Sequence, residues 1–122
     1  MKKKSHISNS EMQIMEYIWK KGCAVTTAEI MQSLPKAADW NQKTVITFLS
    51  RLIEKGVLKS TRIGRAFHYA PCITEQQYRN SETMQFVNDV HKGSIFGFVL
   101  ALCDNGDLTK EEIEALMKRL KE

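Results

Sequence analysis

Side chains able to catalyse a reaction or to hold a metal ion are few and scattered along this sequence. Three histidines and three cysteines are present: His6, His68, His91, Cys23, Cys72 and Cys103. None of them forms an HExxH or CxxC motif of the kind that binds zinc. The sequence also has no glycine-rich nucleotide-binding loop and no G-x-S-x-G turn for a nucleophilic serine. We therefore expect no enzyme, no cofactor and no metal site.

A different set of side chains has chemistry that suits DNA. Asn41 is a good N-cap for a predicted helix that ends at Gly56. One face of this helix is apolar, and we expect it to be buried; it carries Val45, Phe48, Leu49, Leu52 and Ile53. The outer face carries Asn41, Gln42, Lys43, Thr44, Thr47, Ser50 and Arg51. No carboxylate precedes Glu54 on this outer face, and a phosphate-lined groove favours amides, hydroxyls and cations. We expect the outer face to contact DNA.

The elements that position this helix are marked by caps and turns. Capping boxes at residues 8–11 and 26–29, in which side chains satisfy free backbone N–H groups, predict helices that end at Gly22 and Pro35. After Gly56 the pattern changes to two β-favouring runs, 57–63 and 66–70. Such short runs around a glycine-containing turn are typical of a hairpin.

The turn of this hairpin is Gly64-Arg65, and Arg62 and Arg65 flank its tip. We expect both arginines to touch a neighbouring phosphate or the minor groove. The order helix, short extended stretch, helix, helix, hairpin over residues 1–72 is that of a winged helix-turn-helix. The helix after Asn41 is then the recognition helix, and the hairpin is the wing.

Residues 73–122 form a predicted second region of three helices, which begin near Thr74, Ser94 and Thr109. These 50 residues carry more apolar side chains than such small helices can bury alone, so we expect a homodimer. The expected dimerisation residues are Phe86, Val90, Ile95, Phe98, Val99, Leu102, Ile113, Leu116 and Leu120. The alternative is that these helices fold back onto the winged-helix domain of the same chain. The fold class is mainly α with one small β-hairpin.

Charge and composition agree with two regions that have different tasks. Residues 1–72 hold 12 Lys/Arg and 5 Asp/Glu, a net charge of +7, whereas residues 73–122 hold 6 and 9, a net charge of −3. A basic region of this kind suits a polyanion. The longest apolar run, from Ile95 to Cys103, is far shorter than a membrane span, and unpaired cysteines suit a reducing compartment. We expect a cytoplasmic protein without membrane insertion.

Three blocks of the sequence resemble a known family. They are Ile7-Ser8-x-x-Glu11, Thr26-x-x-Glu29-Ile30 and Lys43-Thr44-Val45-x-Thr47-x-Leu49-x-Arg51-Leu52. Together they are similar to the penicillinase repressors of bacteria, a family that includes methicillin-resistance and copper-transport repressors. The resemblance implies a winged-helix homodimer that binds a palindromic operator in double-stranded DNA and represses antibiotic-resistance or stress genes. It also implies DNA contacts by Lys43, Thr44, Thr47 and Arg51, and release through a membrane receptor and protease system.

Three features depart from the pattern of that family. Antibiotic-responsive members are cut at an Asn-Phe bond, and this sequence has Ala101-Leu102 there. Copper-responsive members end in a cysteine-rich metal hook, whereas no cysteine follows Cys103. Ile46 occupies a variable position where some relatives have a basic side chain. We therefore expect either no proteolytic induction at this bond or cleavage with a different specificity, no copper sensing through a metal hook, and a base preference that differs at residue 46. The sequence leaves the inducing signal open.

Two other classes of function stay open. One is a winged-helix module whose basic face docks on an acidic protein surface. The other is a regulator that responds through a thiol or a metal, if the fold brings Cys72 to His68 or Cys103 to His91. Salt-dependent binding to duplex DNA with a sequence preference would separate the repressor from the docking module.

Overall fold

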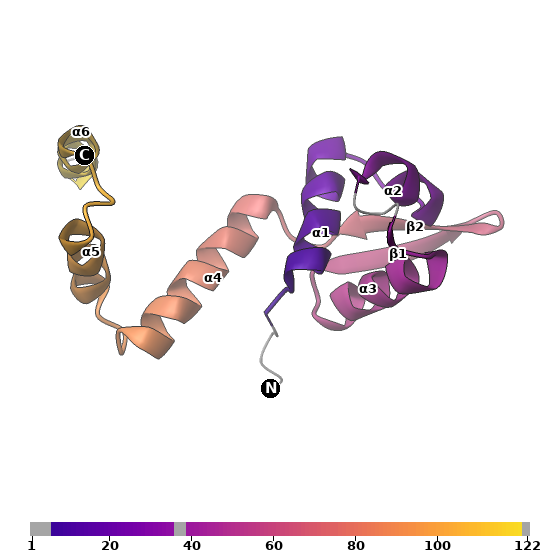
Figure 1. Ribbon diagram of the computed structural model, residues 1–122, viewed down its shortest axis with the longest axis horizontal. Coiled ribbons are helices and arrows are strands. Elements are labelled where there is room, and N and C mark those ends of the chain that lie inside the picture. Colours follow the sequence, from indigo (N-terminus) through magenta and orange to yellow (C-terminus); the bar gives the residue numbers. More distant parts are fainter. Residues whose placement is uncertain (1–5, 36–38, 121–122) are drawn as a thin grey trace. The chain divides into compact units, whose positions relative to one another are not determined.

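A computed structural model describes residues 6–35 and 39–120 of the chain (Figure 1). The chain divides into two compact units, and the division falls between Asn80 and Ser81. Mostly helical elements and one two-stranded antiparallel hairpin make up the fold, which confirms the expected class. The long helix α4, Glu75–Val90, begins in the first unit and ends in the second.

Three helices of the first unit begin at the caps that the sequence predicts. Helix α1 spans Asn9–Lys21, α2 spans Thr27–Ser33 and α3 spans Gln42–Glu54. Complete capping boxes open α1 and α2, where the cap side chain and the third helical residue satisfy each other's backbone N–H. Helix α1 ends at Gly22, whose φ of 76° is a left-handed conformation that favours glycine.

The wing is a hairpin of β1, Leu58–Ile63, and β2, Ala66–Pro71. The strands pair in antiparallel register, with Ser60 opposite Tyr69. The expected extended stretch before α2 adds one bridge to this sheet, because Val25 exchanges two backbone hydrogen bonds of 2.8 and 2.9 Å with Tyr69. The turn of the hairpin projects beyond α2 and α3 (Figure 1). The wing is therefore joined to the helices at its base and free at its tip.

One hydrophobic core holds the first unit together. It draws side chains from all three helices, the bridge residue, both strands and the start of α4. Its largest fully buried members are Ile14, Met15, Ile18, Ile30, Leu49, Leu52 and Leu58. Tyr78 of α4 is 3% exposed and belongs to the same core, where its ring lies 5.9 Å from that of Trp19. The first six residues of α4 are thus part of the winged-helix unit.

The apolar face of α3 is narrower than the sequence pattern suggests. Val45, Leu49 and Leu52 are fully buried, and Phe48 is half-buried against Trp40. The expected burial of Ile53 is wrong, because its side chain is 38% exposed. Ile53 lies at the edge of the apolar stripe in the last turn of the helix, where helical periodicity alone does not guarantee a packing partner.

The second unit contains the rest of α4, then α5, Ile95–Asp104, and α6, Lys110–Leu120. Helices α5 and α6 begin where the sequence predicts, and each is capped: the Ser94 hydroxyl accepts from Gly97 N and the Thr109 hydroxyl accepts from Glu112 N. Among residues 6–35 and 39–120, no single helix is long and apolar enough to span a membrane. Helices α4 and α5 would do so only as a pair bent by 92°.

Apolar side chains remain exposed in this unit. Six expected dimerisation residues are at least 36% exposed: Phe86, Val90, Ile95, Val99, Ile113 and Leu116. Phe98 and Leu102 are half-buried. The side chain of Leu120 lies outside the described part of the chain. Dimerisation through these residues stays a prediction.

Candidate nucleic-acid interface

The N-terminus of α3 is organised by Asn41. The side-chain oxygen Oδ1 of Asn41 accepts a hydrogen bond of 2.7 Å from the backbone N–H of Thr44 and one of 2.9 Å from the Thr44 hydroxyl. Both side chains therefore help to fix the first turn. Thr44 is half-buried, so the structure gives this residue a capping contact in addition to the DNA contact that the sequence suggests.

The other predicted DNA-binding residues of α3 lie on its exposed surface. They are Gln42, Lys43, Thr47, Ser50 and Arg51. The first turn of α3 contains no acidic residue, whereas the first turns of α1 and α2 contain Glu11 and Glu29. The positive end of the α3 dipole is thus left unneutralised beside the cation of Lys43, which favours an anionic partner such as a phosphate.

The wing carries the two remaining candidates, and both are exposed. The Arg62 guanidinium lies 5.8 Å from the centre of the Phe67 ring, and its Nε donates a 3.3 Å hydrogen bond to the Gly64 carbonyl. These contacts hold Arg62 along the hairpin. Arg65 sits in the turn itself, where Gly64 has a φ of 65°.

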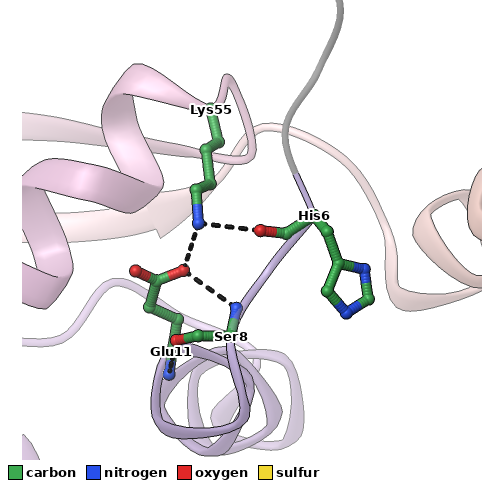
Figure 2. Close-up of polar contacts among 4 residues, drawn as sticks. All are labelled: His6, Ser8, Glu11 and Lys55. Carbon is green, nitrogen blue, oxygen red and sulfur yellow. Dashed lines mark hydrogen bonds and ion pairs between the residues drawn. The ribbon is translucent and has the colours of Figure 1, made fainter.

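A buried ion pair that the sequence did not predict fixes the C-terminal end of α3 (Figure 2). Lys55, the C-cap of α3, donates from Nζ to Oε1 of Glu11 at 2.5 Å and to the His6 carbonyl at 2.8 Å. The Glu11 side chain is 2% exposed and that of Lys55 is 17% exposed. The same carboxylate oxygen accepts from the backbone N–H of Ser8 at 3.1 Å. One carboxylate therefore joins the start of α1 to the end of α3.

Burial on its own raises the pKa of Glu11, because it disfavours the charged carboxylate. The hydrogen bond from Lys55, the backbone N–H of Ser8 and the nearby ammonium charge outweigh burial, so that the net pKa lies below its ordinary value of 4.5. Glu11 is therefore ionised near neutral pH and Lys55 is neutralised by it. This lysine is not free to bind phosphate.

The two cysteines of the first unit line one pocket. Cys23 and Cys72 are exposed and both line a hollow of about 480 Å³ between the end of α1 and the β2–α4 connection. The indole Nε1 of Trp19, also on this wall, donates a 3.0 Å hydrogen bond to the Ile73 carbonyl. Among the residues that the structure describes, no three His, Cys, Asp or Glu side chains are grouped so as to hold a metal ion.

The remaining pairings proposed for a metal site are not favoured by any contact of the described residues. His68 is half-buried in β2, and its Nδ1 is buried without a hydrogen-bond partner. His91 packs instead against two phenylalanines, with ring centroids 5.7 Å from Phe86 and 5.6 Å from Phe98. Cys103 is exposed on α5.

Comparison with known proteins now decides the family. The family model described as penicillinase repressor matches residues 7–122. The chain belongs to the penicillinase repressor family. It is a DNA-binding transcriptional repressor by that membership.

Two relatives illustrate the range of this family. The chain is 38% identical over 122 residues to the penicillinase repressor of Bacillus licheniformis, which covers all of this chain and 94% of the relative. It is 31% identical over 110 residues to the methicillin resistance regulatory protein MecI of Staphylococcus aureus, over 90% of this chain and 89% of MecI. The family assignment therefore applies to both units.

Solved structures match the winged-helix unit of this penicillinase repressor family member. The solution structure of the DNA-binding domain of the repressor BlaI is 42% identical, with a TM-score of 0.54, over 64% of this chain and 94% of that domain. The monomeric form of Bacillus licheniformis BlaI in complex with the blaP half-operator matches with a TM-score of 0.51 and the same identity and coverage. In that second structure, the BlaI monomer is bound to half-operator DNA.

Proposed function

We propose that this repressor binds a palindromic operator as a homodimer, with α3 of each protomer in the major groove and each wing beside it. The observation that carries this proposal is the exposed face of α3, which has hydrogen-bonding and cationic groups at a helix N-terminus that no carboxylate neutralises. Gln42, Lys43, Thr47, Ser50 and Arg51 would contact bases or phosphates. Asn41 and Thr44 would add their backbone and side-chain polar atoms at the first turn.

The second unit supplies the reason for a dimer. Its exposed apolar side chains would be covered if two copies packed about a two-fold axis. A two-fold axis turns one half-site into two inverted half-sites. Their centres would then lie about one helical turn apart, roughly 34–36 Å, or a small multiple of that distance.

Selection of bound duplexes from a randomised library tests the proposal. We expect an inverted repeat among the duplexes bound at near-physiological salt, and an affinity that falls steeply as salt rises. Arg51→Ala should weaken binding to the selected operator severalfold, whereas Lys21→Ala, which removes an exposed lysine of α1, should not. If the folded protein enriches no sequence, the docking module with an acidic protein partner becomes the better description.

A thiol-responsive regulator is the second candidate function, and the pocket shared by Cys23 and Cys72 favours it. A group attached to either thiol would lie beside the start of α4. Operator affinity should then fall after treatment with N-ethylmaleimide and be protected in a Cys23→Ser/Cys72→Ser variant. Equal affinity before and after treatment would remove this candidate.

The wider biological role follows from the same proposal. We place the protein in the cytoplasm, where bacterial DNA is found, and its target genes among those for antibiotic resistance or stress. A membrane receptor and protease system is the proposed partner for release. The position of the family's cleavage bond is Ala101-Leu102, which lies half-buried on α5, and a protease that cuts here needs a specificity for small and aliphatic residues.

A further inference from the structure

The exposed face of α3 is not polar throughout. Ile46 lies in the middle of it, between Lys43 and Ser50, and its side chain is 41% exposed. Ile46 is not part of the hydrophobic core of the described residues, because the buried residues of α3 are Val45, Leu49 and Leu52. An isoleucine at the centre of a DNA-binding face has to meet something apolar when water is expelled.

The neighbouring threonine adds to this apolar character. The Thr47 hydroxyl donates its proton to the Lys43 carbonyl at 3.0 Å, one helical turn earlier. A hydroxyl has a single proton to donate, so this one is no longer available for a base or a phosphate. Thr47 therefore offers a partner its methyl group and the lone pairs of its hydroxyl.

The major groove contains one apolar mark, the C5-methyl group of thymine, which apolar side chains and the threonine methyl contact. The other base edges present hydrogen-bond donors or acceptors. If Ile46 packed on one of these groups, the group would lose its hydrogen bond with water and gain none from the isoleucine. We propose that Ile46, together with the methyl group of Thr47, reads a thymine methyl in each half-site. Ile46 is then a specificity-determining residue, and this inference rests on the proposed binding of operator DNA.

Deoxyuridine provides the test, because it keeps the Watson–Crick pairing of thymine and lacks only its methyl group. Each thymine of the selected operator is replaced in turn by deoxyuridine, and the affinity is measured for the full-length protein. We expect one position in each half-site to lose about fourfold in affinity, which corresponds to the removal of one buried methyl group. The Ile46→Ala variant should lose most of this difference between the thymine and deoxyuridine duplexes, and the methyl group of Thr47 accounts for what remains.

Two matched variants sharpen the result. Ile46→Val keeps an apolar side chain and should keep most of the deoxyuridine effect, whereas Lys43→Ala should weaken binding to every duplex and leave that effect in place. Circular dichroism verifies that each variant is folded. We expect no loss of structure from the substitutions at Ile46, because this side chain is exposed. If wild-type protein binds the operator but no thymine is sensitive, or if Ile46→Ala keeps the sensitivity, the inference is wrong. If wild-type protein selects no sequence at all, the proposed function fails first and the inference fails with it.

Discussion

The ion pair between Glu11 and Lys55 makes the most direct prediction about stability. Replacing Lys55 with methionine keeps the aliphatic stem but removes the ammonium that neutralises a carboxylate with only 2% of its side chain exposed. Breaking a buried pair on one side typically costs 3–5 kcal/mol, because the remaining charge is left without compensation. Glu11 keeps the hydrogen bond from Ser8 N–H, so we expect a loss at the lower end, about 3 kcal/mol of unfolding free energy.

The double variant Glu11→Gln/Lys55→Met separates charge from packing. It removes both charges and keeps an amide oxygen at residue 11 that can accept from Ser8 N–H. We therefore expect it to recover at least about 1 kcal/mol relative to Lys55→Met alone. With the destabilising effect of Glu11→Gln included, the double-mutant cycle then gives a coupling of more than about 1 kcal/mol, within the range found for residues in one network. A simple sum of the two single effects would mean that the pair does not act as a unit.

Urea denaturation followed by circular dichroism measures these differences, at one fixed protein concentration because the proposed dimerisation would contribute to apparent stability. The matched control is Lys59→Met, at an exposed position of β1. Its effect should stay within about 0.5 kcal/mol of zero. If Lys55→Met behaves like Lys59→Met, the ion pair does not hold α3 to α1 and our reasoning is refuted.

Three further predictions concern pH, DNA binding and assembly. Because the pKa of Glu11 is lowered in the folded protein, its ionised form stabilises the fold above pH 4.5. This contribution disappears as the pH falls through the lower pKa of the folded state. The free energy of unfolding should therefore decline more steeply in acid for wild type than for Glu11→Gln, as urea denaturation at several pH values would show. Arg51→Ala should reduce the slope of log affinity against log salt by about one if this side chain binds a phosphate; an unchanged slope argues for a base contact instead. Leu116→Asp should shift the protein from dimer to monomer in sedimentation at micromolar concentration, while Lys118→Asp, at an exposed position two residues away, should not; equal behaviour would place the interface elsewhere.

Sequence patterns located the elements well wherever the signal was local. The starts of α1 and α2 follow from capping boxes whose two partners are three residues apart, and the end of α1 follows from Gly22. The wing follows from a glycine-containing turn between two β-favouring runs. In each case the residues that determine the conformation are neighbours in the chain.

The sequence was less informative wherever distant residues meet. Glu11 is recognisable as a capping residue, but no local rule pairs it with Lys55, which is 44 residues away. The same limit applies to the pocket that Cys23 and Cys72 both line. Helical periodicity placed Ile53 in the core because it assigns faces without knowing which neighbours are present.

The types of the residues on α3 also gave an incomplete description of its exposed surface. A sequence counts Thr44 and Thr47 as free hydroxyls, whereas in the structure Thr44 donates to Asn41, the N-cap of α3, and Thr47 donates to the Lys43 carbonyl. The polar character of that surface is thus lower than its composition suggests. The exposed Ile46 belongs to the same correction.

The packing of Tyr78 against Trp19 has a practical consequence for spectroscopy. The chain has two tryptophans, and each packs against a different helix. Trp40 contacts Phe48 of α3 with ring centroids 5.1 Å apart, whereas Trp19 lies by Tyr78 and is hydrogen-bonded to Ile73 just before α4. A Trp40→Phe protein would therefore keep a single tryptophan, Trp19, beside the start of α4. Its emission would report, without any added dye, whether events in the second unit reach the winged helix.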